Sequence, residues 1–156
     1  MRPVYETSKD RERESTLAGK IAVMWDIQAK PNPKMYTIDY SFINDAGEVE
    51  GFGEIKTRTH PFGTFPTYMI SSHKVASAKS LASATGLDVF LIVEWSCGTV
   101  GYLSMVDAKP DSIQWGGRKD RGDKQDMEPV NHYEMRQFQI ATKEQIRNGE
   151  FSKNIV

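Results

Sequence analysis

Two carboxylates and an amine lie close together in one short stretch of this chain. Asp39 lies in the run from Met35 to Ile43, and the triplet Glu54-Ile55-Lys56 follows a hairpin's length later. Mg²⁺ binds hard oxygen ligands, usually one or two carboxylates together with waters and a substrate phosphate. An ammonium beside such an ion can polarise an attacking water. These residue types fit the hydrolysis of a phosphate ester, but Glu-x-Lys is also a common solvated ion pair on exposed strands.

A predicted hairpin would bring these side chains together. Polar and apolar residues alternate from Met35 to Ile43, with Asp39 on the polar face. Asn44-Asp45-Ala46-Gly47 supplies turn residues, and a second extended run follows from about Val49 to Arg58. We predict that Asp39 and Glu54 project from the same side of this hairpin.

A helix is predicted before the hairpin. Thr7-Ser8-Lys9-Asp10 has the pattern of a helix N-terminus, and an apolar stripe continues to about Trp25. Projected back one turn, the stripe reaches Glu14. This residue is either a rim glutamate in contact with water or a carboxylate placed beside a charged partner.

A second helix is predicted after the hairpin. Ser71 or Ser72 is its expected N-cap, Thr85 its approximate end and Gly86 its C-terminal stop. The apolar stripe of this helix projects back to Lys74, close to a helix N-terminus that favours anions. Lys74 is therefore either a phosphate contact or a lysine whose stem covers apolar surface.

The longest apolar run, from Leu87 to Trp95, is typical of a strand buried on both faces. Thr99 to Val106 is predicted to be the next strand, whereas residues 59–70 are predicted to form a loop. Residues 112–115 and 130–135 are predicted to be a strand pair that either extends the sheet or forms a small flap.

Three further segments are less regular. Residues 26–33 form either a short strand or an irregular link, because their prolines interrupt a ladder. Residues 142–147 suggest a short helix. Within residues 107–129, Arg118 and Lys119 belong to a run of mixed charge, which is either a solvated loop or a contact to phosphates.

Asp39 followed by Glu54-Ile55-Lys56 resembles the Asp…(Asp/Glu)-x-Lys signature of the PD-(D/E)xK nuclease superfamily, although Ile38 replaces the usual proline before the aspartate. The predicted order of elements over residues 8–106 is similar to the αβββαβ core of that superfamily. The resemblance implies an α/β, restriction-endonuclease-like fold, in which helices flank a mixed central sheet. Residues 107–156 lie outside the resemblance and are predicted to form a C-terminal β-extension.

The resemblance also implies a set of site residues. Asp39 and Glu54 would hold Mg²⁺ or Mn²⁺, with the Ile55 carbonyl as a further ligand. Glu14 would bind the ion directly or through a water, and Lys56 would orient the attacking water.

The implied activity is metal-dependent hydrolysis of DNA by an endonuclease similar to small phage nucleases and junction resolvases, which usually act as dimers. Arg58, Lys74, Arg118 and Lys119 are the expected contacts to DNA phosphates. Two alternatives stand beside this activity. One is a catalytically silent relative that binds DNA or serves in assembly, and the other is an enzyme acting on RNA.

Length and composition predict one soluble domain over residues 1–156. The chain is 38% hydrophobic and 26% charged with a net charge of −1, so attraction to nucleic acid must come from a local basic patch. We expect a cytoplasmic protein, because no apolar run approaches the ~18–20 residues of a membrane span and no signal segment is evident. The single cysteine, Cys97, excludes an intrachain disulfide.

Overall fold

The computed structural model describes residues 8–117 and 127–141. Its helices and strands are α1 (Ser8–Trp25), β1 (Gln28–Pro31), β2 (Tyr40–Ile43), β3 (Val49–Thr57), β4 (Thr67–Ser71), α2 (Ser72–Thr85), β5 (Asp88–Glu94), β6 (Val100–Ser104), β7 (Ser112–Gly117), β8 (Met127–Glu134), the 3₁₀ helix η2 (Met135–Gln137) and β9 (Gln139–Ala141). The helix predicted over residues 142–147 lies outside the described residues. In the part of the chain that is described, no helix has the length and apolar character needed to cross a membrane.

A six-stranded sheet in the order β1-β2-β3-β5-β6-β9 forms the centre of the fold. Strands β3 and β5 are parallel, and every other pair in this sheet is antiparallel. As predicted, β5 is an inner strand, and its residues from Val89 to Val93 are all buried. The sheet is therefore mixed, and the triplet Glu54-Ile55-Lys56 of β3 lies beside β5, the most buried strand of the sheet.

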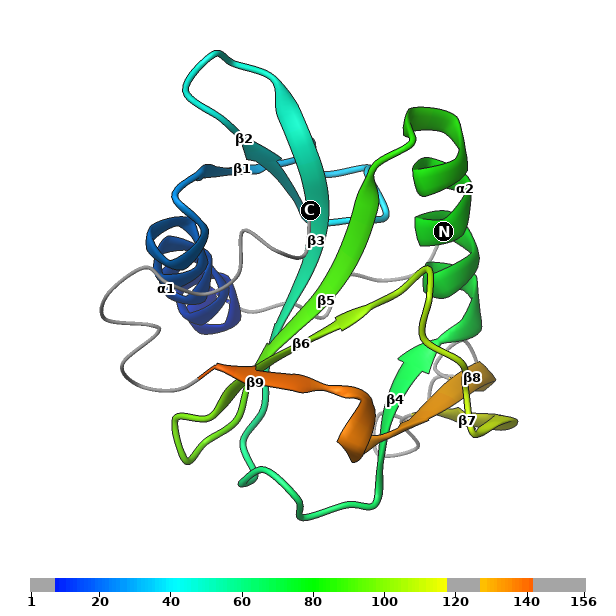
Figure 1. Cartoon of the computed structure of the whole chain (residues 1–156). Helices are drawn as coiled ribbons and strands as arrows, with labels where there is room; N and C mark the ends of the chain where they lie inside the picture. Colours follow the sequence, from blue (N-terminus) through cyan, green and yellow to red (C-terminus); the bar gives the residue numbers. More distant parts are fainter. Residues whose placement is uncertain (1–7, 118–126, 142–156) are drawn as a thin grey trace.

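Helices cover both faces of the central sheet (Figure 1). On one face, α1 buries the stripe that the sequence predicted, with Met24 added, against Phe42, Ile55 and Phe90. On the other face, α2 packs with Phe52, Leu91 and residues of a second sheet. Ile55 therefore points towards α1, whereas its neighbours on β3 point towards α2.

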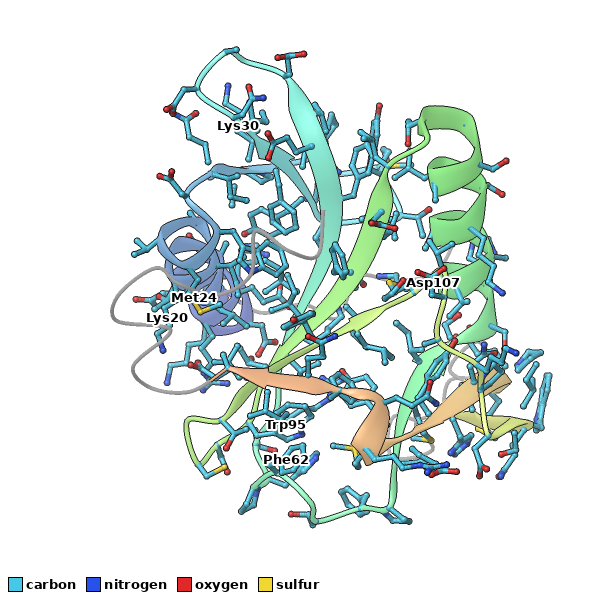
Figure 2. The ribbon with its side chains drawn as sticks, in the orientation of Figure 1. Lys20, Met24, Lys30, Phe62, Trp95 and Asp107 are labelled. Carbon is cyan, nitrogen blue, oxygen red and sulfur yellow. The ribbon has the colours of Figure 1, made fainter. Side chains whose placement is uncertain are left out.

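The prediction of a loop over residues 59–70 was wrong at its end, because β4 occupies Thr67–Ser71. This strand pairs with β8, which pairs in turn with β7, so the two predicted C-terminal strands build a separate three-stranded sheet with β4. Tyr68 and Ile70 face the core and are buried. Earlier in the loop Phe62 packs edge-on against Trp95, with 4.9 Å between ring centroids (Figure 2).

The predicted hairpin is present, but its first strand is shorter than expected. β2 begins at Tyr40, not Met35, and Tyr36 is 57% exposed. The ladder between β1 and β2 starts at Pro31 and Tyr40, so the alternation seen upstream of Tyr40 has no partner strand. The turn forms as predicted, with Gly47 at φ 82°.

Both helix predictions are confirmed in the described residues. The Ser71 hydroxyl caps α2 by accepting a hydrogen bond from the Lys74 backbone N–H at 3.4 Å, and Gly86 ends the helix at φ 73°. Residues 26–33 were predicted to be either a short strand or an irregular link, and they contain the short strand β1 (Gln28–Pro31).

Candidate active site

Asp39 lies immediately before the first residue of β2, where local contacts hold its backbone. The Asn32 backbone N–H donates to the Asp39 carbonyl at 2.7 Å, and the Asn32 side-chain amide donates to the Ile38 carbonyl at 2.9 Å. One Asp39 carboxylate oxygen accepts from the Ile55 backbone N–H at 3.3 Å. This last bond ties Asp39 to the middle of the β3 triplet, and it confirms that the hairpin brings Asp39 next to Glu54 and Lys56. Nothing in the sequence pattern had singled out Asn32.

Glu54 is the most unusual residue of the site, because its side chain is fully buried. Its Oε2 atom accepts a hydrogen bond from the Lys74 ammonium and lies 3.8 Å from the Lys56 ammonium. Its Oε1 atom is buried, and in the ionised carboxylate it accepts no hydrogen bond from a donor among the described residues. A buried carboxylate normally has all its lone pairs satisfied, so an orphaned oxygen indicates a place for a further ligand.

The electrostatics of Glu54 follow from this burial. Loss of solvent raises the pKa of the carboxyl from 4.5 to about 7, the positive charges of Lys56 and Lys74 oppose the rise, and the nearby Asp39 carboxyl adds to it. A strongly perturbed carboxyl with specific charged partners is typical of functional sites.

Lys56 lies between the acids and solvent. Burial alone would lower the pKa of its ammonium, but the negative charges of Glu54, Asp39 and Glu14 outweigh that effect, and the net pKa is raised. Its side chain is 31% exposed, so the ammonium can contact a water or a substrate oxygen. The charge of Lys56 therefore belongs to the acidic cluster.

Glu14 and Asp39 line the same cavity of about 500 Å³, between α1 and the segment that leads into β2. Glu14 is half-buried and close enough to influence the Lys56 charge. Within residues 8–117 and 127–141, however, no three Asp, Glu, His or Cys side chains gather into a preformed metal site. The close pair is Asp39 and Glu54, and Glu14 stands further out.

A divalent cation fits this pair. Two carboxylates on the hairpin, one with an orphaned buried oxygen, are the hard ligands that Mg²⁺ prefers, and the buried negative charge already attracts two ammonium groups. The role of the Ile55 carbonyl as a further ligand stays a prediction.

The expected phosphate contacts have different surroundings. Lys74 lies against Glu54, so its ammonium is part of the acidic cluster. The Arg58 guanidinium lies over the Tyr68 ring, 5.0 Å from its centroid. Both cations line a cavity of about 290 Å³ that also includes Lys56 and Tyr68. Arg118 and Lys119 lie outside the described residues.

Sequence reasoning missed Tyr68 because it assigned this segment to a loop. The available signal was the short apolar run Tyr68-Met69-Ile70 within Thr67–Ser71, which covers too few residues to identify a strand. The strand that pairs with this segment, β8, lies about 60 positions further along the chain, and the side chains of Thr67 and His132 are hydrogen-bonded across a separation of 65 residues.

Among solved structures, the fold is similar to that of Hjc, a Holliday junction resolvase from the archaeal hyperthermophile Archaeoglobus fulgidus. The two chains are 10% identical, the TM-score is 0.51, and the alignment covers 81% of this chain and 84% of Hjc. This likeness confirms the restriction-endonuclease-like fold class. Comparison with curated proteins finds no match.

A protein-family comparison matches residues 1–141 to the family described as "Phage putative PDDEXK endonuclease". The match spans the helix, the hairpin, the central strands and the second sheet, and it confirms the resemblance drawn from Asp39 and Glu54-Ile55-Lys56. The chain therefore belongs to this family of PD-(D/E)xK-type nucleases.

Proposed function

We propose that this protein is an endonuclease that hydrolyses DNA phosphodiester bonds with a divalent cation, Mg²⁺ or Mn²⁺. The observation that carries the proposal is the fully buried Glu54 carboxylate, which has one orphaned oxygen and lies beside Asp39 and Lys56. A structural ion pair would place both carboxylate oxygens against donors. An orphaned oxygen in a cluster of mixed charge instead favours a site that is completed by a ligand.

Four acidic and basic side chains of the hairpin and α1 would each have a separate role in this reaction. Asp39 and Glu54 would hold the cation, with Glu14 in contact through a water and the Ile55 carbonyl as a further ligand. The cation would supply charge stabilisation at the phosphate and a more acidic bound water. Lys56 would hold the attacking water by its ammonium, which keeps its positive charge at neutral pH despite burial, because the neighbouring carboxylates raise its pKa.

Phosphate groups that flank the cleaved bond would contact Arg58 and Lys74, both of which line the cavity beside Lys56. We include Arg118 and Lys119 in this contact set, and we take residues 1–156 as one domain that functions as a homodimer. The similarity in fold to a Holliday junction resolvase makes branched DNA a substrate to include in any assay.

The experiment is cleavage of labelled single-stranded, duplex and four-way-junction DNA with Mg²⁺, Mn²⁺ or EDTA. Glu54→Gln and Lys56→Met keep side-chain volume and should each lower the cleavage rate at least about 100-fold. Their matched controls are Glu48→Gln and Lys79→Met, which change exposed side chains and should cut at the wild-type rate.

Two other outcomes would replace the proposal. No cleavage of any DNA, with no Mg²⁺ binding by calorimetry, would identify a catalytically silent relative that binds DNA or serves in assembly. Metal-dependent cleavage of RNA in preference to every DNA form would keep the site chemistry and change the substrate.

A further inference from the structure

Tyr68 lies in the wall of the proposed active site, although it comes from the second sheet and not from the hairpin. Its side chain is 5% exposed, and its ring packs edge-on against Trp95 and Phe138, with centroids 6.3 and 5.6 Å apart. The same residue lines the cavity shared by Lys56 and Arg58. The ring is therefore fixed by core aromatics, while the residue borders the space where a substrate phosphate would lie.

The Tyr68 hydroxyl is buried, and its proton has no acceptor among the described residues, because the nearby Arg58 side chain can only donate to the phenol oxygen. Buried tyrosine hydroxyls usually find a partner, because leaving one unpaired costs about 1–3 kcal/mol. Arg58 cannot supply what is missing. Its guanidinium lies over the ring face and carries only donors, so it cannot accept the phenol proton. The hydroxyl is a fixed donor that still needs an acceptor.

The surroundings select the kind of acceptor. Burial raises the pKa of the Tyr68 phenol, and the positive charges of Arg58 and Lys56 oppose this only in part, so the group stays protonated at neutral pH. A neutral O–H donor beside two cations fits an anionic oxygen. Tyr68 and Glu54 thus form a complementary pair of orphaned atoms, a donor and an acceptor, in the same region of the molecule.

We propose that Tyr68 is a catalytic residue of this site, whose hydroxyl donates a hydrogen bond to a non-bridging oxygen of the phosphodiester being cleaved. This inference rests on the proposed nuclease function. A phosphate bound to a cation satisfies both orphaned atoms at once, since the cation contacts Glu54 and the phosphate oxygen accepts from Tyr68. Negative charge grows on the non-bridging oxygens during hydrolysis, so the bond becomes stronger as the reaction proceeds.

The test compares Tyr68→Phe with Tyr133→Phe, which removes the hydroxyl of the residue directly opposite Tyr68 in the β4–β8 ladder. The Tyr133 hydroxyl accepts a hydrogen bond from the Asn131 side chain at 3.0 Å and does not line the cavity. Tyr68→Phe should lower the cleavage rate about 10- to 100-fold and leave the thermal midpoint unchanged or higher. Tyr133→Phe should lower the thermal midpoint and leave the rate unchanged.

A phosphorothioate at the cleaved position separates substrate contact from a structural effect. Each phosphorothioate diastereomer replaces one of the two non-bridging oxygens with sulfur. If Tyr68 donates to one of these oxygens, sulfur at that oxygen already weakens the hydrogen bond, so adding Tyr68→Phe should slow cleavage less than it does on the normal substrate. The other diastereomer should show the full effect of Tyr68→Phe. Independent effects for both diastereomers, or a wild-type rate for Tyr68→Phe, would overturn the inference while leaving the nuclease function intact.

Binding in Mg²⁺ to protein that carries Lys56→Met gives a readout that does not depend on cleavage. Labelled duplex and four-way-junction DNA should bind the Lys56→Met, Tyr68→Phe double variant about tenfold more weakly than Lys56→Met alone. If wild type cuts nothing, the proposed function fails, but this comparison still decides the role of Tyr68. Equal dissociation constants for the two proteins would then refute the phosphate contact.

Discussion

The metal-free protein should lose stability as the pH rises, and Glu54 should be the cause. The carboxyl is fully buried, and burial raises its pKa in the folded state from 4.5 to about 7. A folded state with the higher pKa binds the proton more tightly than the unfolded chain does. Stability from this group is therefore complete below about pH 4.5, declines as the pH rises, and levels off above about pH 7.

The size of the effect follows from the two pKa values. One pKa unit corresponds to about 1.4 kcal/mol, so a rise from 4.5 to about 7 amounts to about 3 kcal/mol of unfolding free energy. Glutamine has nearly the shape of a protonated glutamate and does not ionise. Glu54→Gln should therefore match the wild type at low pH and exceed its stability by about 3 kcal/mol at about pH 8.

Urea unfolding in EDTA, from about pH 4 to about pH 8, measures this difference directly. Subtracting the two curves removes the contributions of all other titrating groups, and Glu48→Gln, at an exposed position, should show no pH-dependent difference. A gap between wild type and Glu54→Gln that does not change with pH would refute the reasoning. A less stable Glu54→Gln at high pH would also refute it, because attraction to Lys56 and Lys74 would then exceed the cost of burial.

Other changes probe the same site and its support. Lys74→Gln removes a positive charge beside Glu54 that repels a bound cation, so calorimetry should show Mg²⁺ binding about tenfold more tightly, and weaker binding would contradict this repulsion. Gly53→Ala would place a Cβ 2.4 Å from the Phe42 ring and should lower the unfolding free energy by about 1–3 kcal/mol. Gly19→Ala, on α1 with nothing within 4 Å of the added Cβ, should raise it by about 0.5–1 kcal/mol. Urea titration distinguishes these opposite signs, and a loss of stability at both positions would show that contact with Phe42 is not the reason.

Local patterns were enough to predict the hairpin and its acids. The turn at Asn44 to Gly47, the alternation along β3 and the continuous apolar run of β5 each lie within a few residues, so periodicity identifies them. The Asp39 and Glu54 pair followed from the hairpin alone. Reliance on local patterns also explains why the first strand was predicted to begin at Met35 and not at Tyr40. The alternation continues upstream of Tyr40, but β1 provides no pairing there, and the Ile38 carbonyl accepts from the Asn32 side chain instead.

Contacts between distant segments could not be predicted in this way. β4 is a strand because it pairs with β8, and a local sequence pattern cannot predict pairing with a segment so far along the chain. Lys74 was identified as a cation at the mouth of the site, but its hydrogen bond to Glu54 depends on how α2 packs across β3. Sequence patterns therefore describe the carboxylates of the candidate site on the hairpin better than the half that would face the phosphate.

The two orphaned atoms explain how both halves can serve one reaction. In a core selected only for stability, the Glu54 carboxylate and the Tyr68 hydroxyl would each be paired or replaced by apolar groups, because unpaired buried polar atoms are costly. One atom is an acceptor on the hairpin, and the other is a donor on the second sheet. A bound cation and phosphate would satisfy both together, so the stability given up in the free protein would be recovered on binding. DNA together with Mg²⁺ should accordingly raise the thermal midpoint of cleavage-deficient Lys56→Met by more than the sum of their separate effects. Strictly additive effects would mean that the two atoms do not share a ligand.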